Sequence, residues 1–169
     1  MDGSPRGLPL SQRRADWFFV VVFALFTCTS LVSDLPHALG WTTGALADAN
    51  AAYARAAGDA YFASNPVPLR VRLMLSAFLF PFITTTLSYA FARGLNGVRP
   101  LALMYGAVLG FGVVEFFGWE YLSGQMATNL PVFLGANGPY LLVPILLVLR
   151  MWRPMPFGTA TDARAGHAA

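Results

Sequence analysis

Hydrophobic residues gather in four long stretches of this 169-residue chain, and polar residues, glycines and prolines separate the stretches. Each stretch is close to the ~20 residues that a helix needs to cross about 30 Å of hydrocarbon. The pattern predicts four membrane-spanning helices, which we place at about residues 16–36, 71–92, 100–122 and 131–152. We therefore expect an all-α fold, a four-helix transmembrane bundle.

The first apolar stretch follows two basic residues, Arg13 and Arg14, an order that is also found in signal peptides. The apolar run is too long for a signal peptide, and it continues past Cys28. We therefore expect a retained helix. Cys28 is also the only cysteine in the sequence, which excludes an intrachain disulfide and a metal site built from several thiolates.

The sequence between the first two stretches is rich in alanine, with acidic and aromatic residues dispersed in it. We expect residues 45–62 to form a short amphipathic or irregular segment on the membrane surface, ended by the helix breaker NPVP. The same pattern predicts three regions along the chain. They are an N-terminal tail (1–12), a membrane domain (13–154) and a disordered C-terminal tail (155–169).

The composition agrees with a membrane protein. The chain is 56% hydrophobic and only 11% charged, which is too few charged residues for an ordinary globular domain. Its net charge of +3 is too small to indicate a nucleic-acid partner. We expect the lipid bilayer as its surroundings.

The arginines are distributed unequally between the two predicted sides of the membrane. With an even number of spans, both termini and the second connection share one side, and positive residues accumulate on the cytoplasmic side. That side holds Arg6, Arg13, Arg14, Arg93, Arg99, Arg150, Arg153 and Arg164, whereas the other side holds Arg55, Arg70 and Arg72. Both termini are therefore predicted to be cytoplasmic, in the inner membrane of a bacterium or the endoplasmic reticulum of a eukaryote.

Two acids, Asp34 and Glu115, are the main candidates for a functional site. An acid near hydrocarbon costs about 2.5–3.5 kcal/mol on insertion scales unless it finds water, a cation or a proton. The predicted orientation places both acids in one half of the bilayer, in the same half as Tyr140. For Glu115 we expect a place in a ligand cavity, with a hydrogen bond between helices as the alternative. For Asp34 the alternative is a helix cap exposed to water.

A third acid, Glu120, follows Glu115 by five residues, which is about 140° around a helix. The two side chains therefore cannot both point into one narrow seam. Because Glu120 lies beside Trp119 at an aromatic-belt position, we expect it at the membrane interface, paired with Arg70 or Arg72. A place for Glu120 and Trp119 in the ligand site is the alternative.

The histidines and the spacing of possible metal ligands do not indicate a catalytic or metal site. His37 follows Asp34 closely, and a single histidine at a helix end is more often interfacial than catalytic. Pairs of His, Cys or Glu with the spacing of metal ligands are absent from the sequence, so we expect no metal and no cofactor.

Proline and glycine are placed inside the predicted spans. Pro81 and Pro144 each remove a backbone donor and favour a bend. The third span contains Gly106 and Gly110 at a four-residue spacing, which usually lets helices approach closely. Close packing and room for a bulky apolar ligand both remain open.

Four segments together resemble proteins of the EXPERA superfamily, which includes the emopamil-binding protein and the sigma-2 receptor. The segments are RRADWFFVVVFALFTCTSLVSD, NPVPLRVRLMLSAFLF with SYAFARG, VRPLALMYG and NGPYLLVPILLVLRMWRP. They occur in the order and spacing of the family, over about residues 13–154.

The resemblance implies a bundle of four membrane helices with a sterol-sized cavity that is entered laterally from lipid. By position, Asp34 matches the family's first-helix acid, which orients the cavity or pairs with a ligand amine. Tyr140 matches the aromatic residue of the PYLL-P motif in the last helix. The family's second-helix Glu is missing, and Ser76 lies near its expected position.

Three functions follow from these observations. The first is binding of a sterol-like, terpenoid-like or other amphiphilic lipid, with Asp34, Glu115, Tyr140 and Ser76 at the site. The alternative is isomerisation of a sterol or terpenoid double bond, which needs an acid and a base beside the ligand, with Glu115 and Asp34 as the candidates. A third alternative is a membrane scaffold or chaperone without a specific ligand, and a homodimer is left open.

Overall fold

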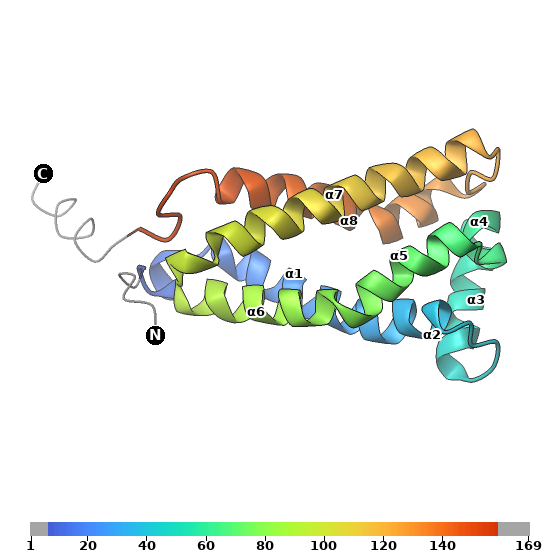
Figure 1. The fold of residues 1–169 in the computed structure, drawn as a ribbon, viewed down its shortest axis with the longest axis horizontal. Coiled ribbons are helices and arrows are strands. Elements are labelled where there is room, and N and C mark those ends of the chain that lie inside the picture. The colour runs from blue at the N-terminus through green and yellow to red at the C-terminus, as the bar shows by residue number, and fades with distance from the viewer. Residues whose placement is uncertain (1–6, 159–169) are drawn as a thin grey trace, which may run out of the picture.

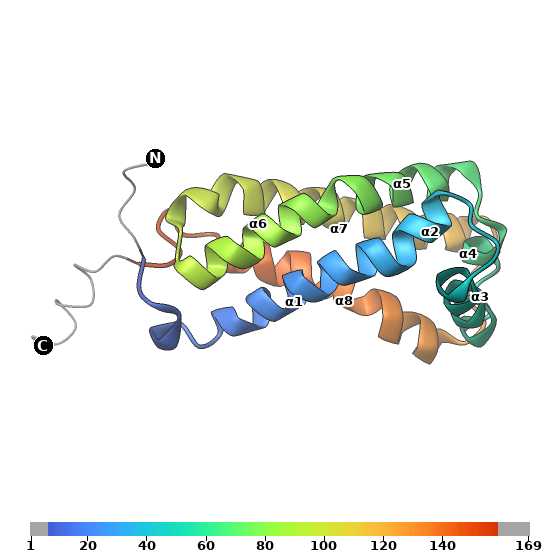
Figure 2. The ribbon, with the colours of Figure 1, turned by 90° about the horizontal axis from the view of Figure 1, so that it is seen from below.

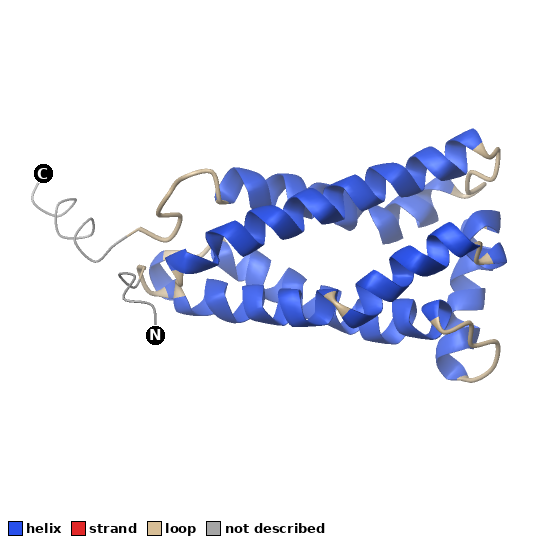
Figure 3. Cartoon of the chain, viewed as in Figure 1, coloured by secondary structure: helices blue, strands red, loops and turns tan. Residues whose placement is uncertain are grey.

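The computed structural model describes residues 7–158, and every regular element in that range is a helix. Figure 3 shows helices joined by short loops, with no strand among the described residues. The predicted all-α class is therefore confirmed. The proposed tails fall partly at residues 1–6 and 159–169, which lie outside the described range.

Three continuous helical segments are long and apolar enough to cross a membrane. The first joins α1 (Asp16–Thr29), the π-helix η2 (Ser30–Asp34) and α2 (Leu35–Ala38). The second contains α7 (Arg99–Leu122), preceded by the short 3-10 helix η3 (Asn96–Val98), and the third is α8 (Leu130–Arg150).

The stretch predicted as one span at residues 71–92 is a broken helix. Helices α5 (Val67–Phe78) and α6 (Phe80–Arg93) are bent by 42° relative to each other. Pro81 lies in the first turn of α6 and has no N–H to continue the hydrogen bonds of α5, which explains the break. The fold has four candidate spans if this bent pair counts as one, and three if it does not.

The segment predicted as a single surface element at 45–62 forms two helices, α3 (Ala45–Ala57) and α4 (Ala60–Ser64). They are separated by Gly58, whose φ of 61° is unfavourable for a side chain. Asp59 then begins α4 by accepting a hydrogen bond from the Phe62 backbone N–H. Both helices lie across one end of the long helices, as Figures 1 and 2 show.

The long helices associate as two pairs, α1 with α6 and α7 with α8, which run side by side in Figure 1. Helix α5 leaves the line of α6 at the bend and packs against α2 and η2 instead. One apolar cluster fills the bundle near η1 (Leu10–Gln12), and a second lies beneath α3 and α4. The two clusters hold the bundle together near its two ends.

Asp16 links the beginning and the end of the described residues, on the side of the bundle opposite α3 and α4. Its buried carboxylate pairs with Arg13 and, at 2.7 Å, with Nε of Arg150. Both guanidinium groups also lie over the ring of Phe157, at 4.6 and 5.4 Å from its centre. Residues 155–158 are therefore held against the bundle rather than extending away from it.

This arrangement predicts a large stability loss for Asp16→Asn, because two buried or half-buried arginines would lose their shared counter-charge. We expect the free energy of unfolding to fall by about 3–5 kcal/mol. The neighbouring Arg14 is exposed, so Arg14→Gln should change it by less than about 0.5 kcal/mol. Thermal denaturation in detergent measures both variants, and equal melting of the two would contradict the role assigned to Asp16.

Candidate functional site

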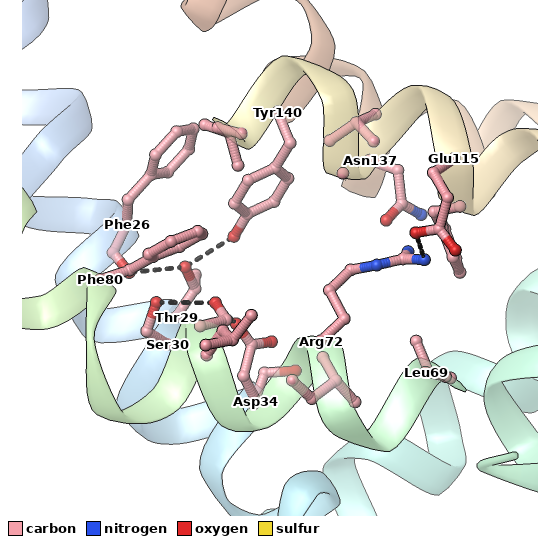
Figure 4. Close-up of a pocket in the computed structure, with 18 of the residues that line it drawn as sticks. Phe26, Thr29, Ser30, Asp34, Leu69, Arg72, Phe80, Glu115, Asn137 and Tyr140 are labelled. Carbon is pink, nitrogen blue, oxygen red and sulfur yellow. Dashed lines mark hydrogen bonds and ion pairs between the residues drawn. The ribbon is translucent and has the colours of Figure 1, made fainter. Parts of the chain in front are cut away.

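A cavity of about 660 Å³ lies between the two helix pairs. Its walls come from α1, η2, α5, α7 and α8, with contributions from α3, α4 and the first residue of α6. Most of the lining is aliphatic or aromatic, and a few polar groups project into it, as Figure 4 shows.

The cavity opens between α5 and α7. Val71 and Leu75 on α5 line it and are also more than half exposed on the outer surface. Val108 and Phe111 on α7 face them with 49% and 74% of their surface exposed. Side chains that line the cavity and are also this exposed mark the rim of an opening, and all four of these residues are apolar.

The π-helix η2 places Asp34 in the cavity wall. Its wider turn interrupts the regular α-helical positions between α1 and α2. Asp34 is half-buried there and accepts a 2.5 Å hydrogen bond from the hydroxyl of Ser76 on α5. The Ser76 hydroxyl also lies 3.3 Å from that of Ser30. These three residues form a small polar group on one wall.

Tyr140 reaches the cavity from α8, on the opposite wall. Its hydroxyl lies 2.6 Å from the Thr29 hydroxyl, and its ring stacks on Phe26 with 4.4 Å between ring centres. Tyr105 and Phe80 close the same part of the cavity with an edge-to-face contact at 5.2 Å. This end is therefore aromatic and offers hydroxyls that are already hydrogen-bonded.

Arg72 on α5 forms an ion pair with Glu115 on α7, and both side chains line the cavity. Its guanidinium carbon lies 5.3 Å from the centre of the Phe116 ring. In Figure 4 the Arg72 side chain extends from α5 across the cavity toward Glu115 and Asn137. The pair connects the two helices that form the rim.

A further polar contact connects the cavity to α3. Asn137 on α8 donates a 2.7 Å hydrogen bond to the hydroxyl of Tyr53, and both residues line the cavity. Burial raises the pKa of Tyr53 to about 12, opposed by the hydrogen bond from Asn137 and reinforced by the negative charges of Asp59 and Glu120. Burial also raises the pKa of Asp59. Tyr53 therefore remains a neutral phenol that can donate or accept a hydrogen bond.

Four of the residues expected at a ligand site line this one cavity: Asp34, Ser76, Glu115 and Tyr140. The structure brings them together from η2, α5, α7 and α8. Trp119 is not part of the lining and is 46% exposed.

Glu120 differs from its expected position. It is fully buried rather than interfacial, and one of its oxygens accepts a 3.4 Å hydrogen bond from the Ala127 backbone N–H. The predicted pairing of Glu120 with Arg70 or Arg72 is wrong: among the described residues Arg72 pairs with Glu115, and no ion pair joins Glu120 to Arg70. The turn of α7 that separates the two acids directs Glu120 away from α5 and outside the cavity lining.

Sequence reasoning missed Asn137, Tyr53 and Thr29 as lining residues, and it placed Arg72 at the interface only. Asn137 had a usable signal, because it is an uncharged polar residue inside a predicted span. Tyr53 had none, since its contribution depends on how α3 folds over the cavity. Within residues 7–158, no group of three or more His, Cys, Asp and Glu residues lies together as metal ligands would.

The fold and the cavity together define an integral membrane protein with a largely apolar pocket between its helices. A family model described as EXPERA (EXPanded EBP superfamily) matches residues 45–151. The chain belongs to this family, and the resemblance seen in the sequence is confirmed. The matched region includes α5, α7 and α8 but begins after Asp34. Comparison with curated proteins and with solved structures gave no match.

The contact between Ser76 and Asp34 gives a second prediction. Ser76→Ala removes the donor to a half-buried carboxylate, so the free energy of unfolding should fall by about 1–3 kcal/mol. Thr86→Ala is the control on the following helix, because Thr86 is exposed and its hydroxyl bonds only to the Phe82 carbonyl of its own helix. Thermal denaturation of the two variants in one detergent provides the comparison. If Ser76→Ala were as stable as Thr86→Ala, the contact would contribute nothing.

Proposed function

We propose that the protein is a four-span membrane protein that binds a sterol-like or other hydrophobic or amphiphilic lipid in the cavity between its helices. The observation that carries the proposal is the cavity of about 660 Å³ that opens between α5 and α7. Pockets for small molecules are typically about 300–1,000 Å³, with mostly apolar walls and a few polar groups that orient the ligand. The volume and lining fit that description.

The position of the opening supports entry from lipid. If α5 and α6 form one bent span, the α5–α7 rim faces the hydrocarbon, and Val71, Leu75, Val108 and Phe111 contact lipid tails directly. An apolar ligand then passes from lipid to cavity without crossing water. The polar groups inside the cavity offer hydrogen bonds that pure hydrocarbon does not.

The geometry supports binding better than double-bond isomerisation. Isomerisation needs one group that gives a proton and another that takes one. Glu115 is engaged by Arg72, and Asp34 is hydrogen-bonded to Ser76. Both candidate acids are thus already engaged by other side chains of the protein. Binding requires no such transfer.

Filling the cavity tests the proposed function. Val113 lines the cavity, whereas its neighbour Val114 is 61% exposed and lies outside the lining. Val113→Trp should weaken binding of neutral lipids by about tenfold or more, since the indole occupies the ligand's space. Val114→Trp introduces the same side chain on the lipid-facing surface and should leave the affinity within about twofold.

The measurement is a titration of detergent-purified protein with a sterol, a polycyclic terpenoid and a fatty alcohol, read by ligand-induced thermal stabilisation. Native mass spectrometry of the purified protein identifies copurifying lipid, which should be depleted in Val113→Trp alone. Equal binding by both variants would place the ligand elsewhere. If none of the three lipid classes binds, a scaffold or chaperone without a specific ligand explains the fold better.

The arginine distribution supports a topology with both termini in the cytoplasm, which we include in the proposal. Thr43 is exposed between α2 and α3, and Gly97 is exposed between α6 and α7, so the two positions should face opposite sides. In a Cys28→Ser background, Thr43→Cys in intact cells or sealed vesicles should react with a membrane-impermeant maleimide from the non-cytoplasmic side. Gly97→Cys should react only after the membrane is opened, and the reverse pattern would invert the topology.

A further inference from the structure

We propose that Arg72 recognises the acidic headgroup of an amphiphile, a carboxylate or a phosphate, and that Glu115 occupies its guanidinium until such a ligand displaces it. This inference rests on the proposed function and names the class of ligand for the same cavity.

Arg72 is held across the opening by contacts along its whole length. Its Cδ lies 4.0 Å from the position that a Cβ on Gly112 would take, so its aliphatic stem passes close to α7 where that helix has no side chain. The guanidinium then lies above the Phe116 ring. The cation is thereby presented at a defined place in the lining, and its position does not depend on Glu115 alone.

The guanidinium has unused hydrogen-bonding capacity. Arginine carries five N–H donors and commonly binds a carboxylate or phosphate through two of them. Among residues 7–158, the structure gives Arg72 one hydrogen-bond acceptor, a single oxygen of Glu115. The remaining donors are available to an acceptor that enters the cavity.

Both members of the pair are accessible to an incoming ligand. Their side chains are 21% and 32% exposed, unlike Asp16, whose side chain is 1% exposed in its own ion pairs. The pair also adjoins the apolar rim at Val71 and Phe111. Because both groups are reached from the cavity, an entering anion can compete with Glu115 for the guanidinium of Arg72.

The position of Arg72 along α5 matches the shape of an amphiphile. It lies in the second turn of the helix, near the end covered by α3 and α4, whereas Leu75 and Val108 line the cavity further from that end. A headgroup at Arg72 places an apolar tail along the aliphatic and aromatic lining toward Tyr105 and Tyr140. The polar headgroup then lies at the charged part of the cavity, and the apolar tail lies along its apolar walls.

The test compares ligands that differ only in the acidic group. Oleate and oleyl alcohol are titrated into the detergent-purified full chain at alkaline pH, where the fatty acid is ionised, and the ratio of their affinities is the readout. Arg72→Gln should lower the preference for oleate by about tenfold, because a charged hydrogen bond is lost. Glu115→Gln should raise it by about tenfold, because the internal competitor is neutralised.

Opposite shifts in the two variants distinguish recognition from a structural ion pair, whose loss would affect both ligands alike. Arg72→Lys keeps the charge without the planar fork and should give an intermediate ratio, which guards against a folding defect in Arg72→Gln. The same ratio is measured for oleoyl lysophosphatidate and monoolein, which lacks the phosphate. Comparing the two ratios shows whether the site prefers a phosphate or a carboxylate headgroup.

The outcomes separate this inference from the proposed function. If oleate and oleyl alcohol both bind and their affinity ratio is unchanged, or shifts in the same direction, in Arg72→Gln and Glu115→Gln, the headgroup assignment is overturned while lipid binding stands. If neither ligand pair binds the wild-type protein, both proposals fail.

Discussion

A charged or polar side chain in hydrocarbon must find its partner inside the protein, and this constraint organises the whole molecule. Asp16 meets it with Arg13 and Arg150, and the resulting buried network closes one end of the bundle. Asp34 meets it with Ser76, which connects η2 to α5. The Arg72–Glu115 pair meets it across the opening between α5 and α7. The same requirement thus produces a buried network at one end, a polar wall in the cavity and an ion pair across its opening.

The cavity lies where α5 leaves the line of α6 and packs against α2 and η2. Apolar clusters fill the two ends, one around Phe23 and Phe91 and the other around Phe116 and Phe133. Between them α5 departs from α6 and approaches α2, so the space facing α7 is not filled by side chains. A lipid in that space would complete the apolar interior, and this physical need is the reason for assigning the cavity a ligand.

The sequence predicted the parts of this structure that depend on composition and helix length. The apolar stretches became helices, and the four residues Asp34, Ser76, Glu115 and Tyr140 lie around one cavity. It did not predict features that depend on how helices rotate against each other. Glu120 is buried rather than interfacial because its side of α7 lies away from α5, and no local pattern around Glu120 records that rotation. The prediction of one segment at 45–62 missed the break at Gly58, and the folding of α3 and α4 into a two-helix cap depends on contacts of α3 with α8 and α2.

The bend between α5 and α6 has a consequence for the width of the cavity. Helix α6 is fixed along α1, whereas α5 joins it through the single residue Leu79, where the two helices meet at 42°. A change of a few degrees at this joint moves the far end of α5 much more than its near end, as a hinged arm does. The width of the space between α5 and α7 is therefore set by the angle at Leu79 and by the packing of α5 against α2 and η2, and not by the α1–α6 pair.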